Sequence, residues 1–511
     1  MTSTARETPI AQPAQLCQMA GVCAVLLLAA AVRLPGLDRP LLGHFSTKNL
    51  TYAMIARNWV EGRASLWRPT MDCLVGEARG LHLLEWPASA YLSGTAWRVF
   101  GGSLDIWGRL TAVAFSVAAV GLMFSLVNRW HGRAAAYGAG LTLALSPAAI
   151  IFGQSFMLEA SLMFFLLASF WGIDRYLTTG RRRWLLAAGA SFSLLLLTKI
   201  YMLVMALPLA MLVWQSLCGQ NSLPWRRTWL EFTLVGMLAV VPAAAWYLDA
   251  WRISAPDHEI SQHVFYSIRR SAAVHHWPHP LLSSPDFYKR MLDEASGAML
   301  TPLGLALALI GLAGMNWQRH AAWLAACGLL VVALPAKFYD LAYYELAILP
   351  AGCVLVGLGW QAIYERIQPG RLGLAMLFLA TVAISLRYAA RPAFMTPEED
   401  RGALPAAAAL RTFADDEEPV AVLHGASTDI LYYSDHPGWA FSVNDRGLVD
   451  KLADARRHGA RWLAVADLQS ADGSPFARAA LAPLRLAGAG PDYRIYELAA
   501  STASRPRRGS K

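Results

Sequence analysis

Charged residues are scarce in this 511-residue sequence. They make up 15% of the chain, whereas hydrophobic residues make up 56%; typical soluble domains carry about 25% charged residues. Apolar stretches close to the roughly 20 residues that cross a bilayer recur along the chain. Because backbone polar groups within lipid must be paired inside the protein, helices are the expected spanning elements. The sequence therefore predicts a polytopic α-helical membrane protein.

Several familiar motifs are missing as well. Only six cysteines occur, and none has the C-x-x-C or His/Cys spacing of a metal site, which argues against a zinc finger or a disulfide framework. No Walker loop, H-E-x-x-H motif or Ser-His-Asp order is present, which argues against an ATPase, a metalloprotease and a hydrolase. The net charge is +9, but the basic residues fall mostly in short loops between apolar stretches. There they indicate topology rather than a nucleic-acid partner.

About eleven transmembrane helices are expected in a domain that spans residues 16–389. Their ranges are 16–34, 108–127, 134–152, 158–178, 184–198, 201–218, 229–248, 296–315, 321–337, 345–363 and 371–388. Arginines concentrate in alternate loops, and by the positive-inside rule these loops face the cytoplasm. This orientation places the N-terminus (1–15) inside. It leaves two long loops, 35–107 and 249–295, on the outer side of the membrane.

The composition changes after residue 390. Short apolar runs that resemble buried strands there alternate with an amphipathic helix. The predicted strands are 419–424, 462–466 and 493–498, and the predicted helix is 447–458. We expect a small α/β domain at 390–500, outside the membrane, followed by a disordered basic tail at 501–511.

The first outer loop carries ionisable residues beside two segments with helical patterning, 52–59 and 88–100, which suit a membrane surface. Glu85 stands in a Glu-x-Pro motif directly before the second segment. Its carboxylate either caps that helix or acts in chemistry, as a proton acceptor or a metal ligand. Lys48, Arg57 and Asp72 are each either solvated loop residues or members of a site.

Ionisable groups at the mouths of spans are costly, so they are further candidates. Glu159 is at the start of the fourth span. It is either an interfacial acid near the headgroups or a buried group that has a partner or faces a wet cavity. Lys199 follows the fifth span and either binds a phosphate as a point charge or snorkels to the surface. Tyr343 and Tyr344 either belong to an aromatic belt or line a site. The loop 249–295 adds histidines without metal-site spacing: His258, His263, His275, His276 and His279.

Together these features resemble the bacterial glycosyltransferase family 39 proteins of the C-type membrane fold. Relatives of that family are the protein O-mannosyltransferases and the lipid A aminoarabinose transferases. The shared order is one span, a long outer loop ending in Glu-x-Pro, then SPAAIIFGQSFMLEASLMFF, LTKI and a Tyr-Tyr pair, over about residues 15–390.

The resemblance implies an enzyme of the bacterial inner membrane that moves a sugar from a polyprenyl-phosphate carrier to an acceptor on the periplasmic side. The acceptor is a lipid, a glycan or a protein, and membrane lipids surround the enzyme. A carboxylate would deprotonate the acceptor hydroxyl. Basic groups or a divalent metal would stabilise the departing phosphate.

The resemblance also assigns roles by position. The predicted catalytic residues are Glu85, Asp72 and Glu159. The predicted substrate-binding residues are Lys48, Asn49, Arg57, Lys199, Tyr343 and Tyr344. The chain departs from many family members because Gly43 to Asn49 contains no carboxylate, where those members carry an early Asp. One of the three predicted carboxylates would then act as the base, or the chain is altered or inactive.

Two other functions fit a polytopic chain of this kind. A flippase or transporter for a lipid-linked saccharide would tend to show repeated halves and broken spans at the midplane. The sequence shows no such repeat, and its polar candidates gather on one face. A non-catalytic scaffold of an envelope-assembly complex is the other alternative, which the missing early Asp leaves open.

Overall fold

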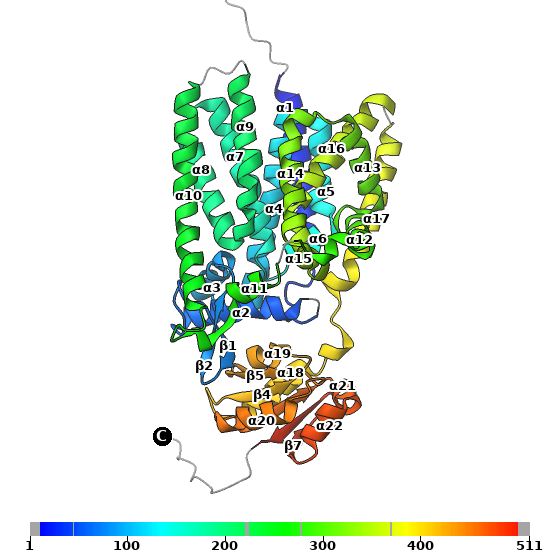
Figure 1. Cartoon of the computed structure of the whole chain (residues 1–511). Helices are drawn as coiled ribbons and strands as arrows, with labels where there is room; N and C mark the ends of the chain where they lie inside the picture. The colour runs from blue at the N-terminus through cyan, green and yellow to red at the C-terminus, as the bar shows by residue number, and fades with distance from the viewer. Residues whose placement is uncertain (1–10, 44, 220–223, 276–277, 368–369, 499–511) are drawn as a thin grey trace, which may run out of the picture.

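The computed structural model describes residues 11–43, 45–219, 224–275, 278–367 and 370–498. Long helices form a bundle, drawn in the upper part of Figure 1, and a smaller group of strands and helices lies below it. The first outer loop lies between these two parts. The predicted tail at 501–511 lies outside the described residues.

The bundle helices overlap the predicted apolar stretches except one, at Pro285–Glu294, which lies in the predicted outer loop 249–295. They are α1 (Ala11–Ala31), α4 (Leu104–His131), α5 (Arg133–Leu145), α6 (Pro147–Gly153), α7 (Glu159–Thr179), α8 (Arg182–Thr198), η1 (Ile200–Met205), α9 (Ala206–Cys218), α10 (Trp225–Ile253), α12 (Pro285–Glu294), η4 (Ala295–Met299), α13 (Thr301–Gly314), α14 (Trp317–Ala333), α16 (Leu349–Ile367) and α17 (Arg371–Phe394). Among the described residues, three segments are long and apolar enough to cross a membrane: α4, η1 with α9, and α10. Two bent pairs raise this number to five. The count of eleven spans stays a prediction.

One bent pair joins α5 to α6 at an angle of 56°. Ser146 caps α6 by accepting a hydrogen bond from the Ala149 amide. The break frees carbonyl groups at the end of α5, and the buried Arg33 guanidinium donates to two of them, at Leu143 (3.2 Å) and Ala144 (2.8 Å). A charged side chain from the turn after α1 therefore stabilises a broken helix inside the bundle.

The first outer loop contains a β-hairpin in addition to the two helices expected from the sequence. It contains α2 (Ser46–Val60), the antiparallel hairpin β1 (Thr70–Val75) and β2 (Ala78–Leu83), and α3 (Ala88–Phe100). The expected helices at 52–59 and 88–100 are present. However, α2 is buried continuously from Asn49 to Asn58 rather than lying along a surface. The reason is that α3, α4, β1 and α19 (Asp429–Ser434) pack around it.

The second long outer loop contributes β3 (Val264–Ser267) and α11 (Ile268–Ala273), and β3 pairs with β2. Between α14 and α16 the chain forms α15 (Pro335–Asp340) and η5 (Ala342–Ala347), which carries the paired tyrosines.

After α17 the chain forms the elements of the lower part. They are η6 (Glu398–Asp400), α18 (Ala403–Phe413), β4 (Val420–Leu423), α19, β5 (Gly438–Phe441), α20 (Leu448–Arg457), β6 (Trp462–Ala466), α21 (Leu468–Gly473), α22 (Pro475–Leu481), β7 (Arg485–Ala489) and β8 (Tyr493–Glu497). The three predicted strands coincide with β4, β6 and β8, and the predicted helix coincides with α20.

A single mixed sheet links the lower part to both outer loops. Its strand order is β3-β2-β1-β5-β4-β6-β8-β7. The junction is the parallel pairing of β1 with β5, at Cys73 and Gly438. A Cβ atom at Gly438 would lie 1.9 Å from the Val420 carbonyl oxygen, so only glycine fits at this crossing.

Candidate active site

Glu85 is the centre of a buried polar cluster. Its Oε1 accepts a hydrogen bond from the Tyr52 hydroxyl and lies 3.4 Å from Lys48 Nζ and 3.3 Å from Lys199 Nζ. The Glu85 side chain is only 1% exposed. Two ammonium groups and a phenol from distant parts of the sequence therefore converge on one carboxylate oxygen.

The fold explains this convergence. Lys48 and Tyr52 are four residues apart on α2, so they share a helix face. The Trp86 amide donates to the Leu197 carbonyl at 3.0 Å, which holds the Glu-x-Pro segment against the end of α8. Lys199 follows that end directly and meets Glu85.

The charges around Glu85 keep it ionised. Burial alone would raise the pKa of Glu85, but the ammonium groups of Lys199 and Lys48 outweigh burial and hold this pKa well below its usual range. The cluster of two ammonium groups and one carboxylate has an excess of one positive charge. It therefore suits an anion.

Glu159 is a second buried carboxylate close to this cluster. It is the first residue of α7 and is 2% exposed. It lies close enough to Lys199, Lys48 and Glu85 for their charges to interact. Within the described part of the chain its Oε2 has no hydrogen-bond partner.

A cavity of about 140 Å³ opens beside Glu85 and Lys199. Its lining also includes Tyr201, Lys337 and Tyr344. Lys199 Nζ lies 5.3 Å from the Tyr344 ring centroid and 5.8 Å from that of Tyr343, and the Tyr201 and Tyr344 rings stack at 5.3 Å. The tyrosines thus form an aromatic wall around a cationic centre.

His82 also contacts this cluster, although no sequence pattern singles it out. His82 is fully buried, its Nε2 lies 3.9 Å from Glu85 Oε2, and neither ring nitrogen has a hydrogen-bond partner in the described structure. Burial lowers the pKa of His82 to about 3, so the ring is neutral. The sequence does place His82 three residues before Glu85. That spacing indicates a contact only when the position of β2, which carries His82, is known.

The structure places Asp72 and Arg57 in a different network. Arg57 donates to Asp72 at 2.7 Å and to the Tyr432 carbonyl at 2.8 Å, and it pairs with Asp435 at 3.0 Å. Asp72 also accepts from Arg79 at 3.1 Å. These contacts join α2 and β1 to α19. Burial would raise the pKa of Asp72, but Arg57 and Arg79 lower it, so Asp72 stays ionised.

Six of the nine predicted site residues therefore gather in one place: Glu85, Glu159, Lys48, Lys199, Tyr343 and Tyr344. Asp72 pairs with Arg57, which binds the lower part of the molecule, and Asn49 lines a second cavity. Of the described loop histidines, His263 Nδ1 lies 3.3 Å from the Val75 carbonyl oxygen, and His275 lines the cavity beside Glu85, close enough to His279 for their charges to interact. His276 is outside the described residues.

One group among the described residues has the composition of a metal site, namely Asp400, His424 and Asp429. His424 Nδ1 lies 2.8 Å from Asp429, and its Nε2 lies 3.0 Å from the Glu399 carbonyl oxygen. Asp400 accepts from the Gly43 amide at 2.7 Å. Because the imidazole already uses both nitrogens, this group serves as a hydrogen-bonded link to the first outer loop.

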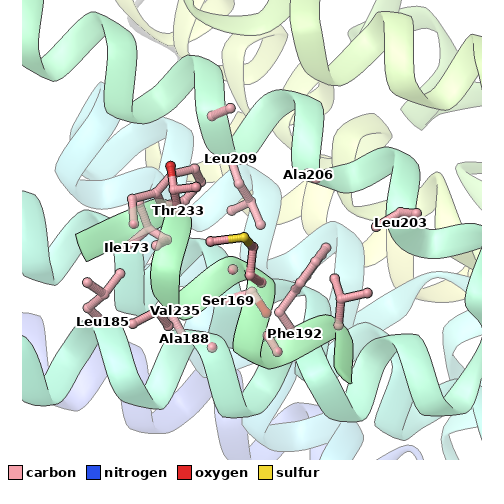
Figure 2. Close-up of a pocket in the computed structure, with 17 residues that line it drawn as sticks. Ser169, Ile173, Leu185, Ala188, Phe192, Leu203, Ala206, Leu209, Thr233 and Val235 are labelled. Atoms are coloured by element: carbon pink, nitrogen blue, oxygen red, sulfur yellow. The ribbon is translucent and has the colours of Figure 1, made fainter. Parts of the chain in front are cut away.

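A larger, apolar cavity of about 420 Å³ lies between α7, α8, α9 and α10 (Figure 2). Figure 2 shows side chains such as Ile173, Phe192 and Leu209 around it, with Ser169 and Thr233 as its polar members. The η1–α9 segment contributes Tyr201 to the cavity beside Glu85 and Leu203 to the apolar cavity. One short segment therefore borders both cavities.

Residues 86–246 match the family model described as dolichyl-phosphate-mannose-protein mannosyltransferase. A search of curated proteins finds no match.

Solved structures match far more of the chain. ArnT from Cupriavidus metallidurans, bound to undecaprenyl phosphate, is 16% identical with a TM-score of 0.60, covering 97% of this chain and 100% of that one. The archaeal oligosaccharyltransferase AglB from Archaeoglobus fulgidus, in complex with an inhibitory peptide and a dolichol-phosphate, is 13% identical with a TM-score of 0.60, covering 89% and 70%. The arabinofuranosyltransferase AftD from Mycobacteria is 16% identical with a TM-score of 0.52, covering 98% and 42%. These comparisons confirm the resemblance drawn from the sequence: the chain has the fold of the C-type membrane glycosyltransferases.

Proposed function

We propose that the protein is a membrane glycosyltransferase that moves a sugar from a polyprenyl-phosphate carrier to a lipid, glycan or protein acceptor at the outer face of the bacterial inner membrane. The observation that carries this proposal is the convergence of Lys48 and Lys199 on Glu85 beside a cavity. The N-terminus would then be cytoplasmic and the residues after 390 periplasmic.

The charges of the cluster fit this reaction. When the bond between the anomeric carbon and the phosphate oxygen breaks, the leaving lipid phosphate gains one negative charge. Lys48 and Lys199 supply positive charge at a site with little water, where it acts most strongly. Glu85 holds both ammonium groups in place, and their charges keep its pKa well below the usual range, which makes it an anchor for them rather than a strong base.

The proton of the acceptor hydroxyl needs another group. We assign it to Glu159, whose Oε2 lacks a partner in the described structure. The hydroxyl oxygen would form its bond to the anomeric carbon while its proton passes to Glu159. This assignment supplies a carboxylate in a chain that lacks the early Asp of many relatives.

The apolar cavity suits the lipid part of the donor. It is lined almost entirely by apolar side chains within the bundle, as a polyprenyl chain requires. The η1–α9 segment that borders it continues from Lys199, so a phosphate at the lysines and a chain in the apolar cavity are compatible.

Purified protein incubated with radiolabelled polyprenyl-phosphate sugars and an envelope extract tests the proposal. We expect label to pass to the acceptor with the wild type and with Lys451→Ala, a matched control on the exposed face of α20. Lys199→Ala should abolish transfer while the protein elutes as a folded monodisperse species. Donor movement across proteoliposomes without any transfer would establish a flippase instead, and neither activity with any donor would favour a scaffold.

A further inference from the structure

A second polar cavity lies on the outer side of the bundle, apart from the cavity beside Glu85. It measures about 30 Å³, roughly two to three times the space that one water molecule needs. Arg39, Asn49, Arg109, Gln154 and Ser155 line it, and none of them lines the cavity beside Glu85. We call these five residues the arginine pocket.

The arginine pocket holds two guanidinium groups that are close enough for their charges to interact. Within the described residues neither Arg39 nor Arg109 forms an ion pair. Asp105 and Asp38 lie near enough to attract Arg109, but Asp105 already accepts the hydroxyl groups of two tyrosines at 2.7 Å each. Paired guanidinium groups without a bound carboxylate are the usual arrangement for binding a phosphate.

Arg109 is held in place from both sides of the pocket. It donates to the Gln154 carbonyl and to the Pro40 carbonyl, at 3.2 Å each. Its Nε has no partner in the described structure. Arg39 occupies space that Gly36 leaves open: a Cβ at Gly36 would lie 2.8 Å from Arg39 Nε, and Gly36 has a φ of +76°.

The pocket also presents acceptors. Asn49 is 6% exposed and Gln154 is 2% exposed, and the amide oxygen of each lacks a partner. Their orientations are set by their nitrogens, because Asn49 donates to the Phe45 carbonyl and Gln154 to the Ala393 carbonyl. Buried polar atoms are nearly always paired, so these two oxygens call for a ligand that donates hydrogen bonds.

The pocket lies where a lipid headgroup would be. Its lining comes from the segment after α1, the start of α4, the end of α6 and the end of α17, so helix ends meet around it. The apolar side chains of Leu34 and Met395, in the same segments, are 46% and 63% exposed. Acyl chains could cover them while the headgroup enters the pocket.

We propose that the arginine pocket binds the phosphodiester headgroup of an anionic phospholipid that carries free hydroxyls, of the phosphatidylglycerol type. The phosphate meets Arg39 and Arg109, and the headgroup hydroxyls donate to the amide oxygens of Asn49 and Gln154. A headgroup that ends in an ammonium group is disfavoured because the guanidinium groups repel it. The site is separate from the donor site, although Asn49 and the donor-facing Lys48 are neighbours on α2.

Native mass spectrometry of the full chain in detergent, titrated with dioleoyl phosphatidylglycerol or dioleoyl phosphatidylethanolamine, tests the proposal. We expect the wild type to retain phosphatidylglycerol preferentially. Arg39→Gln should weaken this binding about tenfold, the loss of one charge-assisted contact. Arg98→Gln, which removes an exposed arginine at the end of α3, should leave it unchanged and controls for general attraction of anionic lipid.

A second variant tests the pocket without removing a charge, in case Arg39→Gln fails to fold. Gly36→Ala keeps both guanidinium groups but displaces Arg39, so it should weaken phosphatidylglycerol binding as well. Equal binding by wild type, Arg39→Gln and Gly36→Ala would overturn the proposal, as would equal retention of the two lipids. Competition arms use sn-glycerol 3-phosphate and inorganic phosphate: displacement of the lipid at equal concentration by either one would show a small-anion site and refute the lipid.

Discussion

Replacing Glu85 by glutamine tests whether Glu85 holds Lys48 and Lys199 in place or acts as the general base. The substitution keeps the shape of the side chain and an acceptor for Tyr52, but it removes the charge that lies 3.3 Å from Lys199 Nζ and 3.4 Å from Lys48 Nζ. With an effective dielectric constant of about 20, each contact corresponds to about 5 kcal/mol of Coulomb energy. Desolvation offsets much of this gain, and removal of one partner from a buried pair costs about 3–5 kcal/mol. We therefore expect Glu85→Gln to lower the free energy of unfolding by about that amount.

The same change raises the positive charge of the cluster from one to two. Polyprenyl phosphate should then stabilise the variant more than it stabilises the wild type, because the ligand supplies the missing negative charge. Thermal unfolding in detergent, with and without undecaprenyl phosphate, measures both effects. Glu77→Gln, at the exposed turn of the β1–β2 hairpin, is the matched control and should behave as the wild type. A Glu85→Gln protein with wild-type stability and no response to the phosphate would refute the anchoring role.

Three further predictions concern other parts of the molecule. Glu159→Gln should reduce sugar transfer by about 10²–10⁴-fold while undecaprenyl phosphate still shifts the unfolding temperature; unchanged transfer would exclude Glu159 as the base. Burial would lower the pKa of His424, but its bond to Asp429 raises it to about 9, above the unfolded value of about 6.5. The resulting stability is complete below pH 6.5 and is lost as the pH rises to 9, so His424→Gln should flatten that slope in thermal unfolding, whereas the more exposed His458→Gln should not. Arg57→Met should loosen the contact with α19 and speed proteolysis after α17, and Asp72→Asn should add little to it in a double mutant; additive effects would contradict a shared network.

Much of the site was predictable because its chemistry is local. Glu85 stands in a Glu-x-Pro motif, and Lys199 ends an apolar run, so each is conspicuous in the sequence. Tyr52 and His82 were not found, because a tyrosine and a histidine in a loop have no distinctive pattern. Their roles depend on how α2 packs against β2, which is a long-range contact.

Asp72 was predicted as a catalytic residue, whereas the structure places it in a network of ion pairs. Its position in the loop suggested chemistry, whereas its partners are Arg57 on α2 and Arg79 on β2, and Arg57 also donates to the distant Tyr432 carbonyl on α19. The strands β4, β6 and β8 were predicted from their apolar runs. The strands β5 and β7 were not, since both are short and contain a glycine and few buried apolar residues.

The junction of β1 with β5 has a consequence for how this protein can be divided. A chain that ended after α17 would leave β1 as an open edge, with unpaired backbone groups exposed beside apolar residues such as Met71 and Cys73. Open edges of this kind recruit strands from other molecules. Truncation at that point should therefore yield a fragment that associates with other molecules. The described residues after α17 thus cover the edge of the outer loop as well as forming the rest of the same sheet.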